Sequence, residues 1–321
     1  MIAKLIKIHT LLLVLFLTLT AQASTLEEST PKTINFKKLV TITLPASDQY
    51  HFFRVNEHQQ ITYIKIHDKP ASYFYDTYNA FPYYDTLIPP HTEPLEISIH
   101  TFLQNDNPNQ ITIELRPATT PTPASLEGHL QFKSGYTAIM RHYLKETQET
   151  NWLHHFKSAQ KAFEADGNHL WAGMAANHAA GEIRLESKYK ESITTYQQAI
   201  EHFIQAKAPA YRWYSESRMG LAEWRLNKIE QAQKRFENIA IHGAQLGLTK
   251  LVITAYNNIG LMHWVKRDIH AAITTYHKTL ALSGITEDQL LKQNIDGIGF
   301  NHISTINNIA LAYQNLGQTQ K

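Results

Sequence analysis

Few side chains in this sequence stand at spacings that suit catalysis. His154 and His155 form the one adjacent histidine pair. Neighbouring residues of a helix point about 100° apart, so this pair is poorly placed to share a metal ion, and we interpret both as surface histidines. Glu182 and Glu186 stand one helical turn apart, which would suit an acid–base pair, but nothing around them in the sequence predicts burial. We therefore interpret both carboxylates as solvated.

Sequence motifs of common enzyme classes are also absent. The chain has no phosphate-binding loop, no Gly-x-Gly-x-x-Gly, no Gly-x-Ser-x-Gly and no His-Glu-x-x-His. It also has no cysteine, which excludes disulfide bonds and thiol catalysis. The sequence predicts a protein without enzymatic activity, cofactor or bound metal, which is stabilised by packing alone.

The N-terminal 23 residues have the pattern of a secretory signal peptide. Lys4 and Lys7 precede a short apolar run over 11–19, and Ala21-Gln22-Ala23 provides the small residues of a cleavage site. The alternative is a retained anchor, but the run is about half of the roughly 20 residues that a membrane-spanning helix needs. We expect an exported protein, periplasmic or secreted, with no membrane insertion after cleavage.

The charge of the mature chain argues against nucleic acid as a partner. The full sequence has 30 basic and 28 acidic residues, and removal of Lys4 and Lys7 leaves 28 of each. Proteins that bind nucleic acids usually carry a basic excess. With 18 histidines, the net charge should vary with pH.

Residues 24–117 have the period-two pattern of β-strands. Apolar residues alternate with polar ones over 95–99 and 111–115, and β-branched or aromatic runs occupy 39–44, 50–55 and 61–66. Residues 105–108 resemble a hairpin loop between the two alternating strands. We predict a small antiparallel β-sandwich-like domain.

A tyrosine-rich stretch over 73–84 could form a binding platform for glycan or peptide, or could pack on the sandwich as part of its core. The Pro- and Thr-rich residues 118–125 then form an extended linker. From 126 to 321 the apolar period is that of helices.

The second half of the chain contains a repeat of 40 residues. An aromatic side chain recurs at Phe156, Tyr196, Phe236 and Tyr276. A small residue precedes each of the last three by 16 positions, at Ala180, Gly220 and Gly260. This register predicts pairs of antiparallel helices, in which the small residue lies where the first helix crosses the second and the aromatic ring fills the gap between hairpins.

The repeat resembles the tetratricopeptide repeat (TPR). The resemblance rests on Met219-Gly220, Ala232 and Phe236 in one hairpin and on Ile259-Gly260, Ala272 and Tyr276 in the next. The period is 40 residues rather than the usual 34, which implies longer helices. We therefore expect a mainly α protein, a TPR-like right-handed solenoid of helical hairpins with a smaller N-terminal β domain. About four hairpins are complete, and a fifth begins at Ile309-Ala310.

The resemblance implies a partner-binding groove along the first helices. In the family, the fifth position of each first helix faces this groove, and here Thr137, Asn177, Ser217, Asn257 and Asn307 match it. The twelfth position matches Leu144, Arg184, Trp224, Trp264 and Gln314. We predict that a protein or peptide binds through Asn177, Asn257, Asn307, Trp224, Trp264 and Arg184. The alternative is structural, with the tryptophans packing between repeats and the asparagines bonding across neighbouring helices.

The order of signal peptide, β module and 40-residue repeats resembles the N-terminal part of bacterial proteins that end in a caspase-like CHAT domain. The join at 111–119 resembles theirs as well. Three functions follow as hypotheses: an exported interaction scaffold, the regulatory half of a CHAT peptidase, or a glycan-binding β module on a repeat spacer. The half-repeat at the end also predicts self-association through Ile306, Ile309 and Tyr313.

The signal peptide gives a direct test. We expect cleavage after Ala23, because the Ala-x-Ala motif follows the apolar run. Mass spectrometry of exported protein should find Ser24 at the N-terminus, and an intact Met1 would contradict the prediction.

Overall fold

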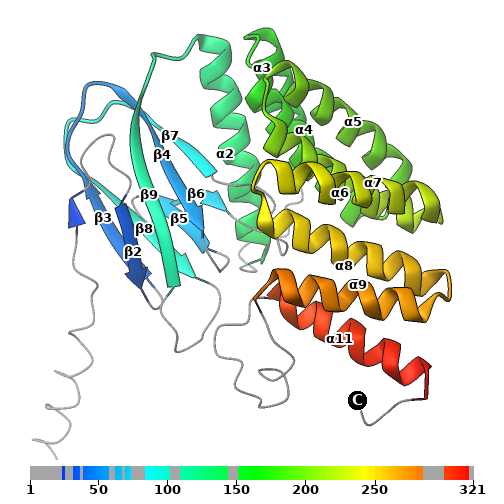
Figure 1. The fold of residues 1–321 in the computed structure, drawn as a ribbon. Helices are drawn as coiled ribbons and strands as arrows, with labels where there is room; N and C mark the ends of the chain where they lie inside the picture. Colours follow the sequence, from blue (N-terminus) through cyan, green and yellow to red (C-terminus); the bar gives the residue numbers. More distant parts are fainter. Residues whose placement is uncertain are drawn as a thin grey trace, which may run out of the picture. The chain divides into compact units, whose positions relative to one another are not determined.

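The computed structural model describes residues 24–25, 32–36, 39–57, 62–66, 69–73, 84–101, 109–143, 151–284 and 300–317 (Figure 1). The chain divides into two compact units with a boundary between Thr120 and Pro121. No helix in the described part of the chain combines the length and the hydrophobicity that crossing a bilayer requires.

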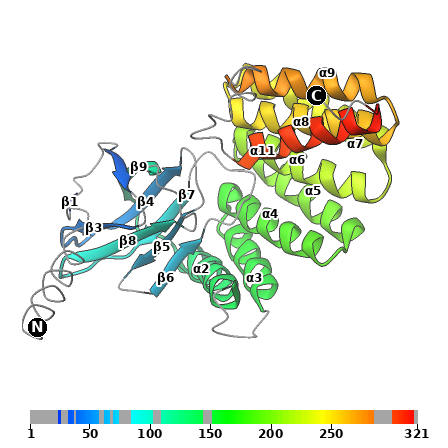
Figure 2. The same cartoon turned by 90° about the horizontal axis from the view of Figure 1, so that it is seen from below.

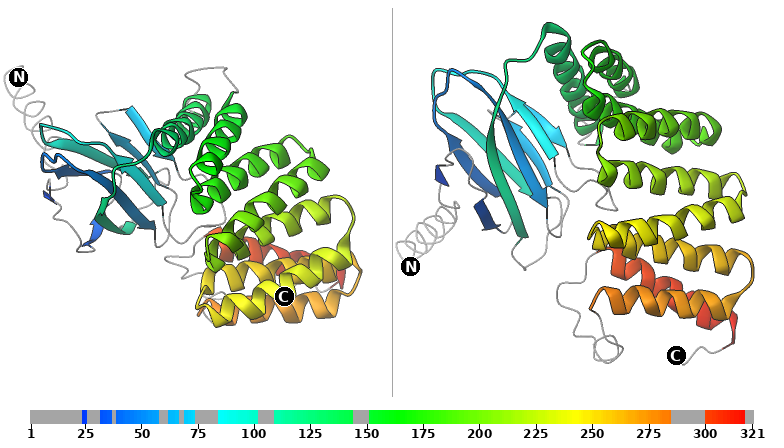
Figure 3. Two further views of the ribbon diagram at one scale, coloured as in Figure 1. Left: turned by 90° about the horizontal axis from the view of Figure 1, so that it is seen from above. Right: turned by 45° about the horizontal axis from the view of Figure 1, so that its top comes forward.

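The N-terminal unit consists of two β-sheets (Figure 3). One sheet has the strand order β1-β3-β8-β5-β6, and the other has the order β2-β9-β4-β7. The strands are β1 (Ser24–Thr25), β2 (Lys32–Phe36), β3 (Leu39–Leu44), β4 (Tyr50–Glu57), β5 (Thr62–Ile66), β6 (Lys69–Tyr73), β7 (Tyr84–Ile88), β8 (Leu95–Thr101) and β9 (Asn109–Ala118). All pairings between these strands are antiparallel except β1 with β3.

Alternate apolar residues of the two sheets form the core, as the period-two pattern predicts. Ile42 of β3 and Ile97 of β8 are fully buried, as are Phe53 of β4 and Ile113 of β9. The intervening side chains, such as Thr41 and Glu114, are partly exposed. This confirms the predicted β-sandwich-like domain.

The predicted hairpin between β8 and β9 is wrong. β8 pairs with β3 and β5 in one sheet, whereas β9 pairs with β2 and β4 in the other. The chain therefore passes from one sheet to the other between these strands. Alternation of polar and apolar residues sets which side chains face the core. Strands of both sheets show the same alternation, so it does not predict which strands pair. Most of the tyrosine-rich stretch, 74–83, lies outside the described residues.

The C-terminal unit is an array of antiparallel helical hairpins (Figures 1 and 2). Its helices are α2 (Pro123–Tyr143), α3 (Trp152–Ala165), α4 (His169–Leu185), α5 (Tyr189–Gln205), α6 (Pro209–Arg225), α7 (Ile229–Gln245), α8 (Thr249–Val265), α9 (Ile269–Leu282) and α11 (Phe300–Asn315). Each of these helices packs against its neighbour in this order. α2 begins at Pro123, within the stretch predicted as linker, because proline suits the first helical position and Thr122 caps the helix by accepting from Ser125 N at 3.0 Å.

Turns of three residues connect the helices from α3 to α9. One residue of each turn has positive φ, and these residues stand 20 positions apart: Gly167, Ser187, Lys207, Asn227, Gly247 and Arg267. Beside each, the backbone bonds back to the preceding helix, as where Ala208 N donates to Phe203 O at 2.9 Å. This is the left-handed residue with which many helices end. The 40-residue repeat is thus two 20-residue steps.

The small residue of each repeat does lie against the aromatic ring of the second helix. A Cβ at Gly220 would stand 2.9 Å from Cζ of Phe236, and a Cβ at Gly260 would overlap the ring of Tyr276. Both rings are almost fully buried. Ala180 packs with Tyr196 in the same way. These contacts confirm the predicted hairpin register from α4 to α9.

The first hairpin keeps the contact at a different spacing. Gly135 of α2 faces Phe156 of α3, and the two residues stand 21 positions apart rather than 16. The connection between α2 and α3 is longer than the other turns, which shifts the first helix by five residues. Phe132, and not Thr137, is therefore the counterpart of Asn177.

The glycine contacts predict which substitutions the array tolerates. Gly220→Leu and Gly260→Leu should each lower the free energy of unfolding by about 1–3 kcal/mol, because the side chain has to displace a buried ring. Chemical denaturation followed by circular dichroism measures the change.

Gly181→Leu is the matched control for these variants. Gly181 is the counterpart of Leu221 and Leu261, and its Cβ would meet only the Tyr196 hydroxyl, at 3.7 Å. A loss of stability at Gly181 equal to that at Gly260 would contradict the assigned contacts.

Candidate partner-binding surface

Two of the predicted asparagines bond between neighbouring hairpins. Asn177 of α4 is 8% exposed, and its Oδ1 accepts a hydrogen bond from Ser215 Oγ of α6 at 2.7 Å. Asn257 of α8 accepts from Thr305 Oγ1 at 3.1 Å and from Asn308 Nδ2 at 3.2 Å, both on α11. These contacts correspond to the structural alternative for Asn177 and Asn257.

The third asparagine lies on the surface. Asn307 of α11 is exposed, on the side of the helix away from the buried Thr305 and Ala312. Asn307 is therefore the most accessible of the three, since Asn177 is buried and Asn257 is only partly exposed.

The predicted tryptophans and arginine are partly buried. The guanidinium of Arg225 lies over the ring of Trp224, 4.4 Å from its centroid. The indole Nε1 of Trp264 and the Nε of Arg184 are buried and have no hydrogen-bond partner in the described part of the chain. Arg184 also bonds the hydroxyl of Tyr196, which ties it to α5. Arg184 therefore contributes to packing within its hairpin.

A ladder of leucines beside the tryptophans was missed in the sequence. Leu221 and Leu261 are partly exposed, and Leu311 is 51% exposed. Each directly follows the small residue of its repeat, and this shared position was the signal in the sequence. Leu221 lies on the same helix face as Trp224, and Leu261 on the same face as Trp264, because residues three apart are neighbours.

These five residues are called the Leu–Trp strip: Leu221, Trp224, Leu261, Trp264 and Leu311. They occupy equivalent positions of α6, α8 and α11, the first helices of three hairpins (Figure 1). Their apolar side chains are partly accessible on one face of the array, which suits contact with an apolar partner.

The geometry of the hairpins identifies the fold of the helical unit. The helical unit is a TPR-like solenoid. Its repeated hairpins, with small residues under aromatic rings, are what the resemblance implied. No protein-family model and no curated protein sequence matches the chain.

Solved structures with similar folds share little sequence with the chain. TPR-like repeats described as a kinesin light chain of Podosopora anserina are 12% identical, with a TM-score of 0.46, over 63% of this chain and 91% of that one. BtubC (BKLC) of P. vanneervenii is 13% identical, with a TM-score of 0.39, over 62% and 87%. Aspartyl phosphate phosphatase F of Bacillus subtilis is 14% identical, with a TM-score of 0.46, over 63% and 58%.

The interpretation of Glu182 as a solvated carboxylate is wrong. Its counterparts in the next hairpins, Ala222 and Met262, are fully buried, and Glu182 lies largely within the packing of α4. Burial raises the pKa of Glu182 from 4.5 to about 7, and Glu186 adds to the rise, against a hydrogen bond from Trp152 and the charge of Arg184. Glu186 is exposed and pairs with Lys188 at 2.7 Å.

A neutral histidine lies one turn away from Glu182. Burial lowers the pKa of His178 to about 3, and its Nε2 lies 2.6 Å from the hydroxyl of Tyr136 on α2. The buried rings of Phe132 and Phe156 surround this pair. His178 and Tyr136 therefore join α2 to α4 as a structural hydrogen bond. Among the described residues, no three His, Asp or Glu side chains come together to hold a metal ion.

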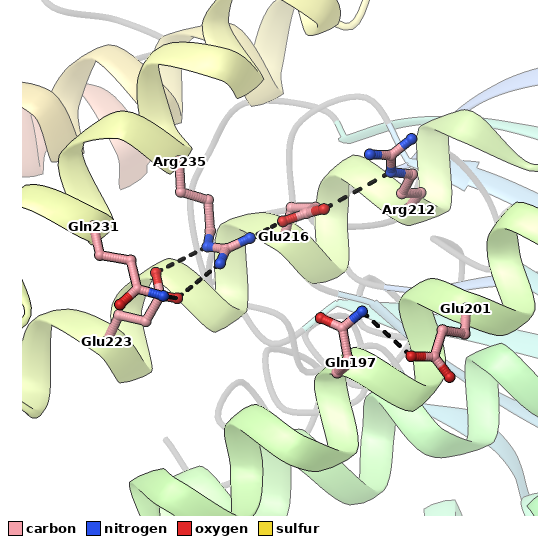
Figure 4. A network of polar contacts seen from close by, with 7 residues as sticks. All are labelled: Gln197, Glu201, Arg212, Glu216, Glu223, Gln231 and Arg235. Atoms are coloured by element: carbon pink, nitrogen blue, oxygen red, sulfur yellow. Dashed lines mark hydrogen bonds and ion pairs between the residues drawn. The ribbon is translucent and has the colours of Figure 1, made fainter.

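An ion-pair network joins the two helices of the middle hairpin (Figure 4). Arg235 of α7 binds both carboxylate oxygens of Glu223, at 2.8 and 2.7 Å, and also bonds Glu216. Gln231 donates to Glu223 at 2.7 Å, and Arg212 lies 3.7 Å from Glu216. Both carboxylates are paired, so they are not poised for acid–base catalysis.

The raised pKa of Glu182 predicts how stability depends on pH. The folded state holds the proton up to about pH 7, whereas the unfolded state releases it near pH 4.5. Wild-type stability should therefore fall between these pH values and stay low above them, by at most about 3 kcal/mol. Glu182→Gln should remove this fall and be more stable than wild type at pH 8.

Glu186→Gln is the matched control, since Glu186 is exposed and one turn away. Denaturant titrations from pH 4 to pH 8 compare the three proteins. Parallel pH profiles of wild type and Glu182→Gln would show that the carboxyl is solvated after all.

Proposed function

We propose that the protein is an exported, non-catalytic interaction scaffold that holds an amphipathic partner helix on the Leu–Trp strip. The observation that carries this proposal is the row of partly accessible Leu and Trp side chains at equivalent positions of three first helices. Tryptophan is enriched at the centre of protein interfaces, and the neighbouring leucines extend its apolar surface.

The spacing of the strip suits a helix. Of the first helices of the strip, α8 and α11 contact one another, and packed helices lie about 8–10 Å apart. Apolar residues seven positions apart on a partner helix are separated by about 10.5 Å. A partner helix with an apolar heptad could therefore place one side chain against each first helix.

The charges near the strip support a mainly apolar contact. Arg225 covers part of Trp224, and this contact is made over the face of the ring. Few ion pairs would form with the partner, so affinity should depend weakly on salt. Export is part of the proposal and is supported by the signal-peptide pattern of residues 1–23, which lie outside the described residues.

Selection of helical peptides from a displayed library on the full chain tests this function. We expect selected peptides to carry apolar residues at heptad spacing. Leu221→Ser and Leu311→Ser should each weaken their binding about tenfold, which corresponds to roughly 1.4 kcal/mol for one lost apolar contact.

Ile241→Ser on α7 and Leu246→Ser directly after it are the matched controls. Both side chains are exposed and apolar, at 56% and 44%, but they lie outside the strip. If the controls weaken binding as much as the strip variants do, or if the strip variants bind normally, the proposed surface is wrong.

A further inference from the structure

A polar groove lies between α3 and α5, the second helices of the first two hairpins. It encloses a volume of about 630 Å³, within the usual range for ligand sites. His154, Lys157 and Lys161 line the wall on α3, and Gln198 and Gln205 line the wall on α5. The Leu–Trp strip belongs to first helices only, so the groove is a separate surface.

The carboxylates of the groove are already bonded within the protein. Glu164 Oε1 accepts from His202 Nε2 at 2.9 Å and from Gln160 Nε2 at 2.8 Å. Glu201 accepts from Gln197 at 3.4 Å. These bonds leave the acidic side chains of the groove with less capacity for a ligand.

The positive charges of Lys157 and Lys161, in contrast, are paired weakly or not at all with carboxylates. Lys161 has no carboxylate partner among the described residues, and Lys157 Nζ lies 3.5 Å from Glu191 in an exposed pair. Such a pair contributes little. The α3 wall therefore carries two lysines against one carboxylate, Glu164, and it lies opposite the amides of Gln198 and Gln205 and the carboxylate of Glu201.

This charge is specific to the first groove. The counterparts of Lys157 and Lys161 are Gln197 and Glu201 on α5, and Glu237 and Ile241 on α7. The lysine pair is thus not a general property of the repeat, and it coincides with the hollow between α3 and α5.

The spacing of the lysines selects the shape of an anionic ligand. Lys157 and Lys161 are one turn apart, about 6 Å along the helix. Alternate side chains of an extended peptide are about 6.7 Å apart and point the same way. The amides of Gln198 and Gln205, about 10.5 Å apart along α5, lie within the span of four extended residues.

We propose that the groove between α3 and α5 binds an extended acidic peptide with carboxylates at alternate positions, Glu-x-Glu or Asp-x-Asp. Its carboxylates pair with Lys157 and Lys161, and its backbone bonds the amides of Gln198 and Gln205. The chemistry differs from that of the Leu–Trp strip, and the two surfaces can be occupied independently.

Fluorescence anisotropy of the full chain with a labelled Ser-Glu-Thr-Glu-Thr-Glu-Ser peptide tests the inference. We expect saturable binding that weakens steeply with salt, because it rests on exposed ion pairs. The double variant Lys157→Gln, Lys161→Gln should bind about tenfold more weakly, since two exposed ion pairs, each modest by itself, are lost together.

Three controls make the result specific. The exposed lysines Lys228 and Lys234 of α6–α7, changed together to Gln, should leave affinity unchanged. A peptide of equal charge with its glutamates adjacent, Ser-Thr-Glu-Glu-Glu-Thr-Ser, should bind more weakly than the alternating one. Leu311→Ser, which tests the strip, should have no effect.

Equal binding of the two peptides would overturn the predicted spacing, and equal binding to both lysine variants would overturn the site. Competition by the anionic polysaccharide alginate as strong as that by unlabelled peptide would show a general polyanion surface and would also overturn the proposal. Failure of these tests leaves the strip untouched, because that surface is measured with other variants and other peptides.

Discussion

The close approach of the two helices in each hairpin is the contact on which the helical unit depends. A phenylalanine or tyrosine ring on the second helix fits against the first only where that helix carries little or no side chain, as at Gly220 and Gly260. The contact sets the register of the hairpin and buries its largest side chain. It also determines which face of the first helix turns outwards. Leu221 and Leu261 each follow a glycine, so the residue that faces the second helix and the residue that faces a partner are neighbours in sequence.

Polar groups at buried positions distinguish the hairpins from one another. The positions of Glu216 and Glu223 are occupied by Ala176 and Ile183 in the preceding hairpin, where both are buried. The carboxylates are retained in α6 because Arg235 and Gln231 satisfy them (Figure 4). Replacing one partner would leave a buried charge uncompensated, which is far more destabilising than the loss of a surface pair. Glu182 is accommodated differently, because burial raises its pKa and so favours the neutral carboxyl group. The α6–α7 hairpin therefore recognises its second helix by charge as well as by shape.

The sequence predicted the helical half well because its signal is periodic. Phe156, Tyr196, Phe236 and Tyr276 kept one spacing, and the structure places each of them in the core. The first hairpin deviated where the connection lengthens, since a fixed period cannot detect five extra residues before Phe156. Partners of polar groups were harder to predict. The sequence does not show whether Asn177 faces a groove or accepts a hydrogen bond from Ser215. The outcome depends on the distance between two first helices, which the sequence does not give. In the β unit, alternation located the strands but not their sheets.

The 20-residue step of the turns limits where the chain can change length. From α3 to α9 every connection has three residues, and one of them is left-handed. An extra residue there would rotate all following helices relative to those before, and would misalign the faces that successive hairpins share. Eight residues separate α2 from α3, and seventeen separate α9 from α11. These two connections are longer than the three-residue turns of the 20-residue step, and the helices on either side of each still pack against one another. They are the natural points at which to graft a reporter domain, or to open a circularly permuted chain, without disturbing the rest of the array.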